Sequence, residues 1–273
     1  MTLEDLFSLK GRIALVTGGS RGIGRMIVEG FLAAGIERVY ITARKGGELH
    51  EAAEELGEKV VPIQGDISTM EGVEELVAAI SAKESKLDIL VNNAGAAWGA
   101  DYTEFPEDGW DKVMDLNVKT PFFLNQKLHK LLTTAASPEH PAKVINITSV
   151  DGQRVNPWET YSYQASKAAL IHLTRRMAAR LVKDHVYVTS LAPGAFPSNM
   201  NRAARDHEEQ SAAGIPSKRV GDKFDMGGTA VYLASRAGAM TGPDDDGKVF
   251  QKGWVRGPPR PRKAARSGSA AAR

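Results

Sequence analysis

The stretch Thr17-Gly18-Gly19-Ser20-Arg21-Gly22-Ile23-Gly24 decides the fold, because it joins two segments of different periodicity. Residues 12–16 form a short apolar run typical of a buried strand, and the apolar residues at 23, 26, 27, 31 and 32 recur at helical spacing. A glycine-rich turn between a strand and a helix lets backbone N–H groups approach a phosphate at the positive end of the helix. The glycines follow G-x-x-x-G-x-G rather than G-x-G-x-x-G, so the stretch is either a variant dinucleotide turn or an ordinary strand-to-helix turn. In the first case the binding residues are Gly18, Ser20, Arg21, Gly22, Ile23 and Gly24.

Strand and helix patterns alternate along the rest of the chain. Further strands are predicted at 38–42, 60–63, 87–91, 143–148 and 185–191, and helices at 48–57, 70–82, 108–134, 160–182 and 225–235. This alternation predicts an α/β protein, with a doubly wound, Rossmann-type parallel sheet flanked by helices in a single domain. The domain is expected over residues 1–256, followed by a disordered basic tail rich in Pro, Ala and Arg at 257–273.

Composition narrows the classes of protein. The chain has 273 residues, 42% of them hydrophobic, which suits one large α/β domain. A net charge of +2 gives no reason to expect nucleic acid or a membrane surface as partner, and the basic tail lacks the interleaved aromatics of a nucleic-acid site. The absence of Cys excludes disulfides and thiolate metal sites, and no metal is predicted. No signal peptide or membrane span is readable, so a cytoplasmic protein is expected.

Basic residues replace the acid that NAD-binding proteins use. About 20 positions beyond the glycines, NAD binders carry a carboxylate for the ribose 2′-hydroxyl. Here that position holds Arg44, followed by Lys45, and Arg21 adds a third cation. Three cations at one place favour a 2′-phosphate over a merely basic surface turn. The pattern therefore predicts NADP(H) as the cofactor.

Other polar and small residues end the predicted strands, where ligands bind in such sheets. Asp66 follows the strand at 60–63, and either accepts from an adenine amino group or caps the next helix, with Ser68 as its rival for that cap. The remaining candidates for cofactor binding at these strand ends are Ile67, Asn93, Ala94, Gly95, Pro193 and Gly194.

Tyr163 and Lys167 are one helical turn apart, so their side chains leave the same face of the predicted helix. A nearby ammonium lowers the pKa of a tyrosine and allows it to exchange a proton with a carbonyl oxygen. The alternative is an ordinary solvated pair on an exposed face. Tyr161 is no candidate, because Ala165 stands four residues after it. Asn117, within the helix at 108–134, is by itself most simply a core amide.

In these motifs the chain resembles the short-chain dehydrogenase/reductases, over residues 9 to 241. The matching segments are 17–24, Asp66, 92–95, Asn117, Ser149, 163–167 and 193–194. Residues 11–24 and Ala97-Trp98-Gly99-Ala100 further resemble the branch of 3-oxoacyl-ACP reductases that includes the rhamnolipid-pathway type.

The resemblance implies a catalytic set of Asn117, Ser149, Tyr163 and Lys167. Tyr163 would protonate the ketone oxygen and Ser149 would donate a hydrogen bond to it. Lys167 would lower the tyrosine pKa and bind the nicotinamide ribose, and Asn117 would hold a relay water. Thr148 is the neighbour most easily mistaken for Ser149, but only one of two successive strand residues can face the substrate. Where the family often has a Thr after Pro193-Gly194, this chain offers Ser198.

The function that follows is NADPH-dependent reduction of a ketone to a secondary alcohol, with a 3-oxoacyl group on ACP or CoA, or a related apolar carbonyl, as the expected substrate. Alternatives are a secondary-alcohol dehydrogenase, a ketoreductase of a secondary-metabolite pathway, and a non-catalytic dinucleotide-binding protein.

The connection at 195–222 is a candidate substrate lid. A homo-oligomer is expected, either a dimer or a tetramer, with Asp244–Asp246 weakening the usual tetramer contact. The expected apolar pocket residues are Trp98, Trp158, Phe196, Met200 and Ile215.

Overall fold

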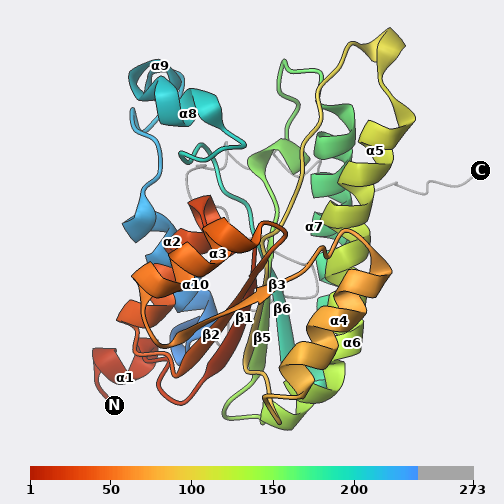
Figure 1. Cartoon of the computed structure of the whole chain (residues 1–273). Helices are drawn as coiled ribbons and strands as arrows, with labels where there is room; N and C mark the ends of the chain where they lie inside the picture. Colours follow the sequence, from red (N-terminus) through yellow and green to blue (C-terminus); the bar gives the residue numbers. More distant parts are fainter. Residues whose placement is uncertain (239–273) are drawn as a thin grey trace, which may run out of the picture.

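A six-stranded parallel sheet forms the centre of the computed structural model, which describes residues 1–238 (Figure 1). The strand order is β3-β2-β1-β4-β5-β6, so the sheet is wound outward in both directions from the β1–β4 pair. The predicted fold class is confirmed, and the strand predictions fall within two residues of the observed ends. The strands are β1 (Ile13–Thr17), β2 (Arg38–Ala43), β3 (Val60–Gln64), β4 (Ile89–Asn92), β5 (Ala142–Ile147) and β6 (Val186–Leu191).

Helices cover both faces of the sheet (Figure 1). On one face, α2 (Gly22–Ala33), α3 (Gly46–Leu56) and α10 (Lys223–Ala234) pack around Ala14 and Val16. On the other, α4 (Met70–Ser81), α6 (Thr120–Ala135) and α7 (Tyr161–Leu181) pack around Ile13 and Leu15. Successive residues of β1 therefore enter opposite cores, which explains why the strand reads as a continuous apolar run.

The predicted helix at 108–134 is interrupted by one wider turn. It consists of α5 (Glu107–Met114), a π-helical segment (Asp115–Lys119) and α6. The Thr120 N–H bonds to the Asp115 carbonyl, five residues back. Pro121 has no N–H to offer the Asn117 carbonyl one turn earlier, which removes a bond of the regular helix. The wider turn carries Asn117, which is buried.

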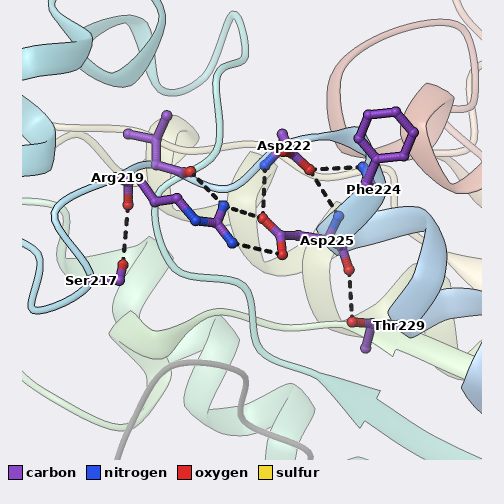
Figure 2. A network of polar contacts seen from close by, with 7 residues as sticks. Ser217, Arg219, Asp222, Phe224, Asp225 and Thr229 are labelled. Carbon is purple, nitrogen blue, oxygen red and sulfur yellow. Dashed lines mark hydrogen bonds and ion pairs between the residues drawn. The ribbon is translucent and has the colours of Figure 1, made fainter.

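The long connection after β6 contains helices that the sequence did not predict. It contains the short helices α8 (Arg202–Asp206) and α9 (Glu208–Ala213), and another short helix that the sequence did not reveal, α1 (Leu3–Phe7), lies near the chain start. The connection ends in a capping box, in which the Asp222 carboxylate accepts from the Phe224 and Asp225 N–H groups at 2.8 and 2.9 Å. Figure 2 shows the two terminal guanidinium nitrogens of Arg219 donating to the Asp225 carboxylate. The capping box sets the start of α10, and the exposed Arg219–Asp225 pair lies beside it.

Several expectations concern residues outside the described range. They are the domain boundary at 256, the disordered tail at 257–273 and the weakened tetramer contact, and they stay predictions of the sequence. Within residues 1–238, no helix is long and apolar enough to cross a membrane, and no cluster of His, Asp and Glu could hold a metal ion.

Candidate active site

A cavity of about 860 Å³ lies across the carboxyl ends of β1, β4, β5 and β6. This is where a doubly wound sheet binds its ligands, beside the point at which the strand order reverses. The structure brings almost all the predicted residues to its wall; Gly24 and Asn117 lie behind it. The predicted residues that line the cavity are Gly18, Ser20, Arg21, Gly22, Ile23, Arg44, Lys45, Asp66, Ile67, Asn93, Ala94, Gly95, Ser149, Tyr163, Lys167, Pro193, Gly194 and Ser198.

The glycine turn is built as a close-packed backbone cradle. Gly18 and Gly22 have φ angles of +66° and +53°, which residues with a Cβ rarely adopt. A Cβ on Gly24 would lie 2.2 Å from the Gly18 carbonyl oxygen, so α2 can begin this close to the turn only with glycine there. Ser198, whose Cβ would lie 3.3 Å from a Cβ on Gly22, borders the turn, and its Oγ accepts from the Asn201 N–H at 3.0 Å.

Asn93 holds the glycine turn in place. Its Nδ2 donates to the carbonyls of Thr17 and Gly18 at 2.9 and 3.2 Å, and its N–H donates to Thr17 Oγ1 at 2.9 Å. The Ala94 N–H donates to the same hydroxyl at 3.0 Å. The side-chain donors of Asn93 are thus used inside the protein, where they hold the glycine turn against the end of β4. The sequence predicted Asn93 at the site but not this structural task.

Ser149 and Thr148 point in different directions, as successive strand residues do. Thr148 Oγ1 donates to the Leu191 carbonyl at 3.0 Å and is occupied by β6. Ser149 Oγ accepts from the Asp151 N–H at 3.1 Å and shares a hydrogen bond with the Tyr163 side chain. Ser149 is therefore the hydroxyl that faces the tyrosine, as predicted.

Lys167 lies beneath Tyr163 but donates elsewhere. Its Nζ bonds to the Ile147 carbonyl at 2.9 Å and lies 5.7 Å from the centroid of the Tyr163 ring. Burial lowers the pKa of Lys167 to about 8. Burial also raises the pKa of Tyr163, and Asp151 adds to that rise, while the hydrogen bond with Ser149 lowers it. The expected lowering of the tyrosine pKa by the ammonium is not seen in this structure, where burial is the main cause of the shift and the ammonium donates to the carbonyl at the end of β5.

Asn117 joins three parts of the site through its side-chain amide. Its Nδ2 donates to the Ala96 carbonyl and to Ser166 Oγ, both at 2.9 Å, and its Oδ1 accepts from the Ala96 N–H at 2.9 Å. Ser166 Oγ in turn donates to the Tyr163 carbonyl at 2.8 Å. A Cβ on Gly95 would lie 3.1 Å from Asn117 Oδ1, so this strand end also needs a small residue. The wide helical turn thus fixes the segment after β4 and the helix of Tyr163 to one another.

The opposite end of the cavity carries exposed charges. Arg21 and Lys45 both bond to Glu48, at 2.9 and 3.1 Å, and Arg44 lies 3.9 Å from Asp66. The hydrogen bond from Lys45 holds the pKa of Glu48 below its ordinary value. Sequence reasoning missed Glu48, although its spacing of three from Lys45 at a helix start was a usable signal.

Asp66 makes a local turn rather than a helix cap. Its Oδ1 accepts from the N–H and Oγ of Ser68, at 3.0 and 2.7 Å. The cap of α4 is Thr69, whose Oγ1 accepts from the Gly72 N–H at 3.1 Å. Both candidates for that cap were therefore wrong, and Asp66 remains at the cavity wall with its side chain half exposed.

Part of the cavity wall is apolar. Trp158, Phe196 and Met200 line it as predicted, whereas Trp98 and Ile215 do not. Trp98 instead packs against Gly109, where a Cβ would meet the indole at 2.8 Å. Charged residues that the sequence did not single out also line the cavity, namely Asp151, Arg154 and Arg205.

Known proteins share both sequence and architecture with this chain. Residues 12–209 match the family profile described as short chain dehydrogenase. The rhamnolipids biosynthesis 3-oxoacyl-[acyl-carrier-protein] reductase of Pseudomonas aeruginosa is 47% identical over 246 residues, covering 88% of this chain and 96% of that protein. The 2-dehydro-3-deoxy-D-gluconate 5-dehydrogenase of Dickeya dadantii is 35% identical over 240 residues, covering 85% and 92%.

Among solved structures, the NADP active-site complex of Pseudomonas aeruginosa RhlG superposes with a TM-score of 0.85. It is 44% identical and covers 90% of this chain and 96% of its own. The fold and the relatives agree with the resemblance seen in the sequence: the chain belongs to the short-chain dehydrogenase family.

Proposed function

We propose that this protein is an NADP-dependent oxidoreductase that reduces a ketone to a secondary alcohol. The observation that carries this proposal is the convergence of Ser149, Tyr163 and Lys167 on the cavity that also holds the glycine turn. A scaffold that merely retained the fold would have no need to keep these three groups together at the end of β5.

The cavity suits a dinucleotide. The positive φ angles of the glycine turn leave its backbone open to a pyrophosphate, and α2 begins directly behind it. The cations Arg21, Arg44 and Lys45 stand where a 2′-phosphate is expected. At the end of β2, where NAD-binding proteins carry a carboxylate for the 2′-hydroxyl, this chain has Arg44 and Lys45. The relative solved with NADP supports the same cofactor.

The bound cofactor supplies the hydride, and the protein protonates and hydrogen-bonds the carbonyl oxygen of the substrate. Tyr163 donates its proton to the carbonyl oxygen as the carbon is reduced, and Ser149 steadies the developing negative charge with a hydrogen bond. The Tyr163 phenolate left by this transfer must regain a proton, and Lys167, one helical turn away with a pKa of about 8, is the proposed donor once its ammonium turns from the Ile147 carbonyl. Asn117 keeps the helix of Tyr163 in register with the segment after β4.

The substrate is a 3-oxoacyl thioester or a related apolar ketone. Trp158, Phe196 and Met200 give the cavity an apolar wall, and the Pseudomonas aeruginosa relative bears the name of a 3-oxoacyl-[acyl-carrier-protein] reductase. Arg154, which lines the same cavity 3.8 Å from Asp151, favours a second candidate, oxidation of a sugar acid, because a guanidinium binds a carboxylate well. The Dickeya dadantii relative is named for such a substrate.

One substrate panel separates the two candidates. The purified protein is supplied with NADPH and short or long 3-oxoacyl thioesters, and the loss of NADPH absorbance is followed. Oxidation of sugar acids is assayed in parallel with NADP and with NAD. We expect the thioesters to give the larger kcat/KM. Activity confined to sugar acids would favour the second candidate, and inactivity in both arms with intact NADPH binding would favour a non-catalytic role.

Cofactor preference is tested separately through Arg44. We expect NADPH to be preferred to NADH by about tenfold or more in kcat/KM, because charge-assisted pairs with the 2′-phosphate are strong. Arg44→Asp should erase or reverse that preference. Equal kcat/KM for both cofactors in the wild-type enzyme would contradict the assignment.

The assembly and its place in the cell remain proposals. We expect a homo-oligomer acting in the cytoplasm on a small or carrier-bound carbonyl substrate. Light scattering on the full chain distinguishes a dimer, a tetramer and a monomer.

A further inference from the structure

Glu48 occupies the centre of the basic end of the cavity. Its Oε2 lies 2.9 Å from an Arg21 guanidinium nitrogen, and its Oε1 lies 3.1 Å from Lys45 Nζ. Each carboxylate oxygen thus holds one of the cations that are proposed to receive the 2′-phosphate. Glu48 lines the same cavity and stands in the first turn of α3, three residues after Lys45.

A carboxylate and a phosphate compete for the same donors. Arg21 comes from the glycine turn and Lys45 from the end of β2, so Glu48 connects two segments that a 2′-phosphate would also connect. The phosphate cannot take the donors of both cations without displacing Glu48 or leaving two negative groups side by side. Arg44 differs from the other two cations, since its nearest carboxylate is Asp66 at 3.9 Å.

Displacement of Glu48 is feasible because the cluster is solvated. The side chains of Arg21, Lys45 and Glu48 are 57%, 73% and 48% exposed. Exposed ion pairs are weak and screened by salt, so the carboxylate can rotate away without loss of the fold. A cofactor that lacks the 2′-phosphate would leave both pairs intact.

We propose that Glu48 limits the discrimination between NADPH and NADH by competing with the 2′-phosphate for Arg21 and Lys45. The inference rests on the proposed cofactor. Glu48 and Arg44 then have opposite effects on cofactor specificity: Arg44 raises the preference for NADPH over NADH, and Glu48 lowers it.

The test measures binding without turnover. Adenosine 2′,5′-bisphosphate and adenosine 5′-monophosphate differ only in the 2′-phosphate, and calorimetry gives the Kd of each for wild type, Glu48→Gln and Glu48→Ala. Glu54→Gln is the matched control, because it removes the same charge from an exposed position on the same helix. We expect both Glu48 variants to bind the bisphosphate roughly three- to tenfold more tightly, with less gain at high salt. The monophosphate should bind within about twofold of wild type, and Glu54→Gln should change neither Kd.

The outcomes are separable. If Glu48→Gln leaves the ratio of the two Kd values unchanged, Glu48 does not compete and the inference is wrong. If the variants bind the bisphosphate more weakly, Glu48 instead positions the cations, which also overturns the inference. A gain that persists when Arg21 and Lys45 are both changed to Met would show that the competition does not act through them. If wild type shows no preference for the bisphosphate or for NADPH, the proposed cofactor itself fails, and this inference with it.

Discussion

Two buried lysines have ammonium groups near opposite ends of β5. They are alike in three local properties: a carbonyl acceptor, a nearby tyrosine ring and a lowered pKa. Lys167 donates to the Ile147 carbonyl at 2.9 Å, and Lys143 donates to the Gly238 carbonyl at 3.3 Å. Each ammonium lies near a tyrosine ring, Lys167 at 5.7 Å from Tyr163 and Lys143 at 4.9 Å from Tyr187. Burial lowers the pKa of both to about 8, with Arg12 adding to the effect at Lys143.

Their surroundings separate them. Lys167, on α7, reaches the carboxyl end of β5 and lines the cavity with Ser149. Lys143 lies near the amino end of β5 and is not among the residues that line that cavity. A shifted pKa is therefore no sufficient sign of catalysis. What distinguishes the functional lysine is an open cavity at the end of the sheet where ligands bind, together with a hydroxyl that can reach a substrate.

The tyrosines provide the largest test of this comparison. We expect Tyr163→Phe to lower kcat by about 10³-fold, because the lost hydroxyl acts as general acid in the transition state. Tyr187→Phe, the matched change beside Lys143, should leave kcat within about twofold of wild type. NADPH binding by Tyr163→Phe, measured by fluorescence titration, should stay within a few-fold. A Tyr163→Phe enzyme that keeps more than a tenth of wild-type kcat would show that another group is the acid.

The lysines themselves come next in expected effect. Lys167→Met should lower kcat by about 10²-fold, since the group proposed to return a proton to Tyr163 is lost. Lys143→Met should leave kcat nearly unchanged, as it lies away from the cavity. Steady-state kinetics with saturating NADPH makes the comparison. Equal losses in the two variants would mean that Lys167 acts mainly by supporting the fold.

Much of this arrangement could be predicted from the sequence, because its signals are local. The glycine turn, the apolar run of β1 and the spacing of Tyr163 and Lys167 all lie within short segments. The features that the sequence did not reveal depend on contacts between distant segments. The ammonium of Lys167 turns toward Ile147 on another element, and nothing in the neighbourhood of Lys143 signals that it is buried.

Local rules also failed where two of them competed. Asp66 and Ser68 both suit a helix start, yet Thr69 caps α4 because the first two bond to each other. The pattern of apolar residues did not show the wide turn at Asn117, although Pro121 was a signal of an interrupted helix. Sequence reasoning thus identified the strand ends that form the site better than it identified the bonds made there.

Stability against pH gives a third test, in which the two lysines should behave alike. Their pKa values lie at about 8 in the folded protein, against 10.5 ordinarily. Between these values the unfolded chain keeps protons that the folded protein has lost, so the free energy of unfolding contributed by each lysine rises with pH. Below about pH 8 both states are protonated, and the full penalty of burying the charge remains.

We therefore expect wild type to gain stability relative to Lys143→Met as pH rises from about 8 to about 10, by a few kcal/mol at most. Urea unfolding at several pH values measures the difference. Lys83→Met, at an exposed position, is the control for the loss of a lysine. A difference between wild type and Lys143→Met that stays constant over this range would contradict the lowered pKa.

The smallest effect is expected for an exposed charge, the Arg219 guanidinium paired with Asp225 (Figure 2). Over half of the Arg219 side chain is exposed, so solvent and salt weaken the pair. Arg219→Gln should shift Tm by no more than about 2 °C. Asp222→Ala should shift it further, because two backbone N–H groups at the start of α10 would lose their acceptor. Calorimetry in low and high salt compares the variants. If Arg219→Gln proved as damaging as Asp222→Ala, with a loss insensitive to salt, the pair would be holding the connection onto α10. Solvent exposure alone would then not explain why some charged groups of this protein affect stability less than the buried Lys143 and Lys167.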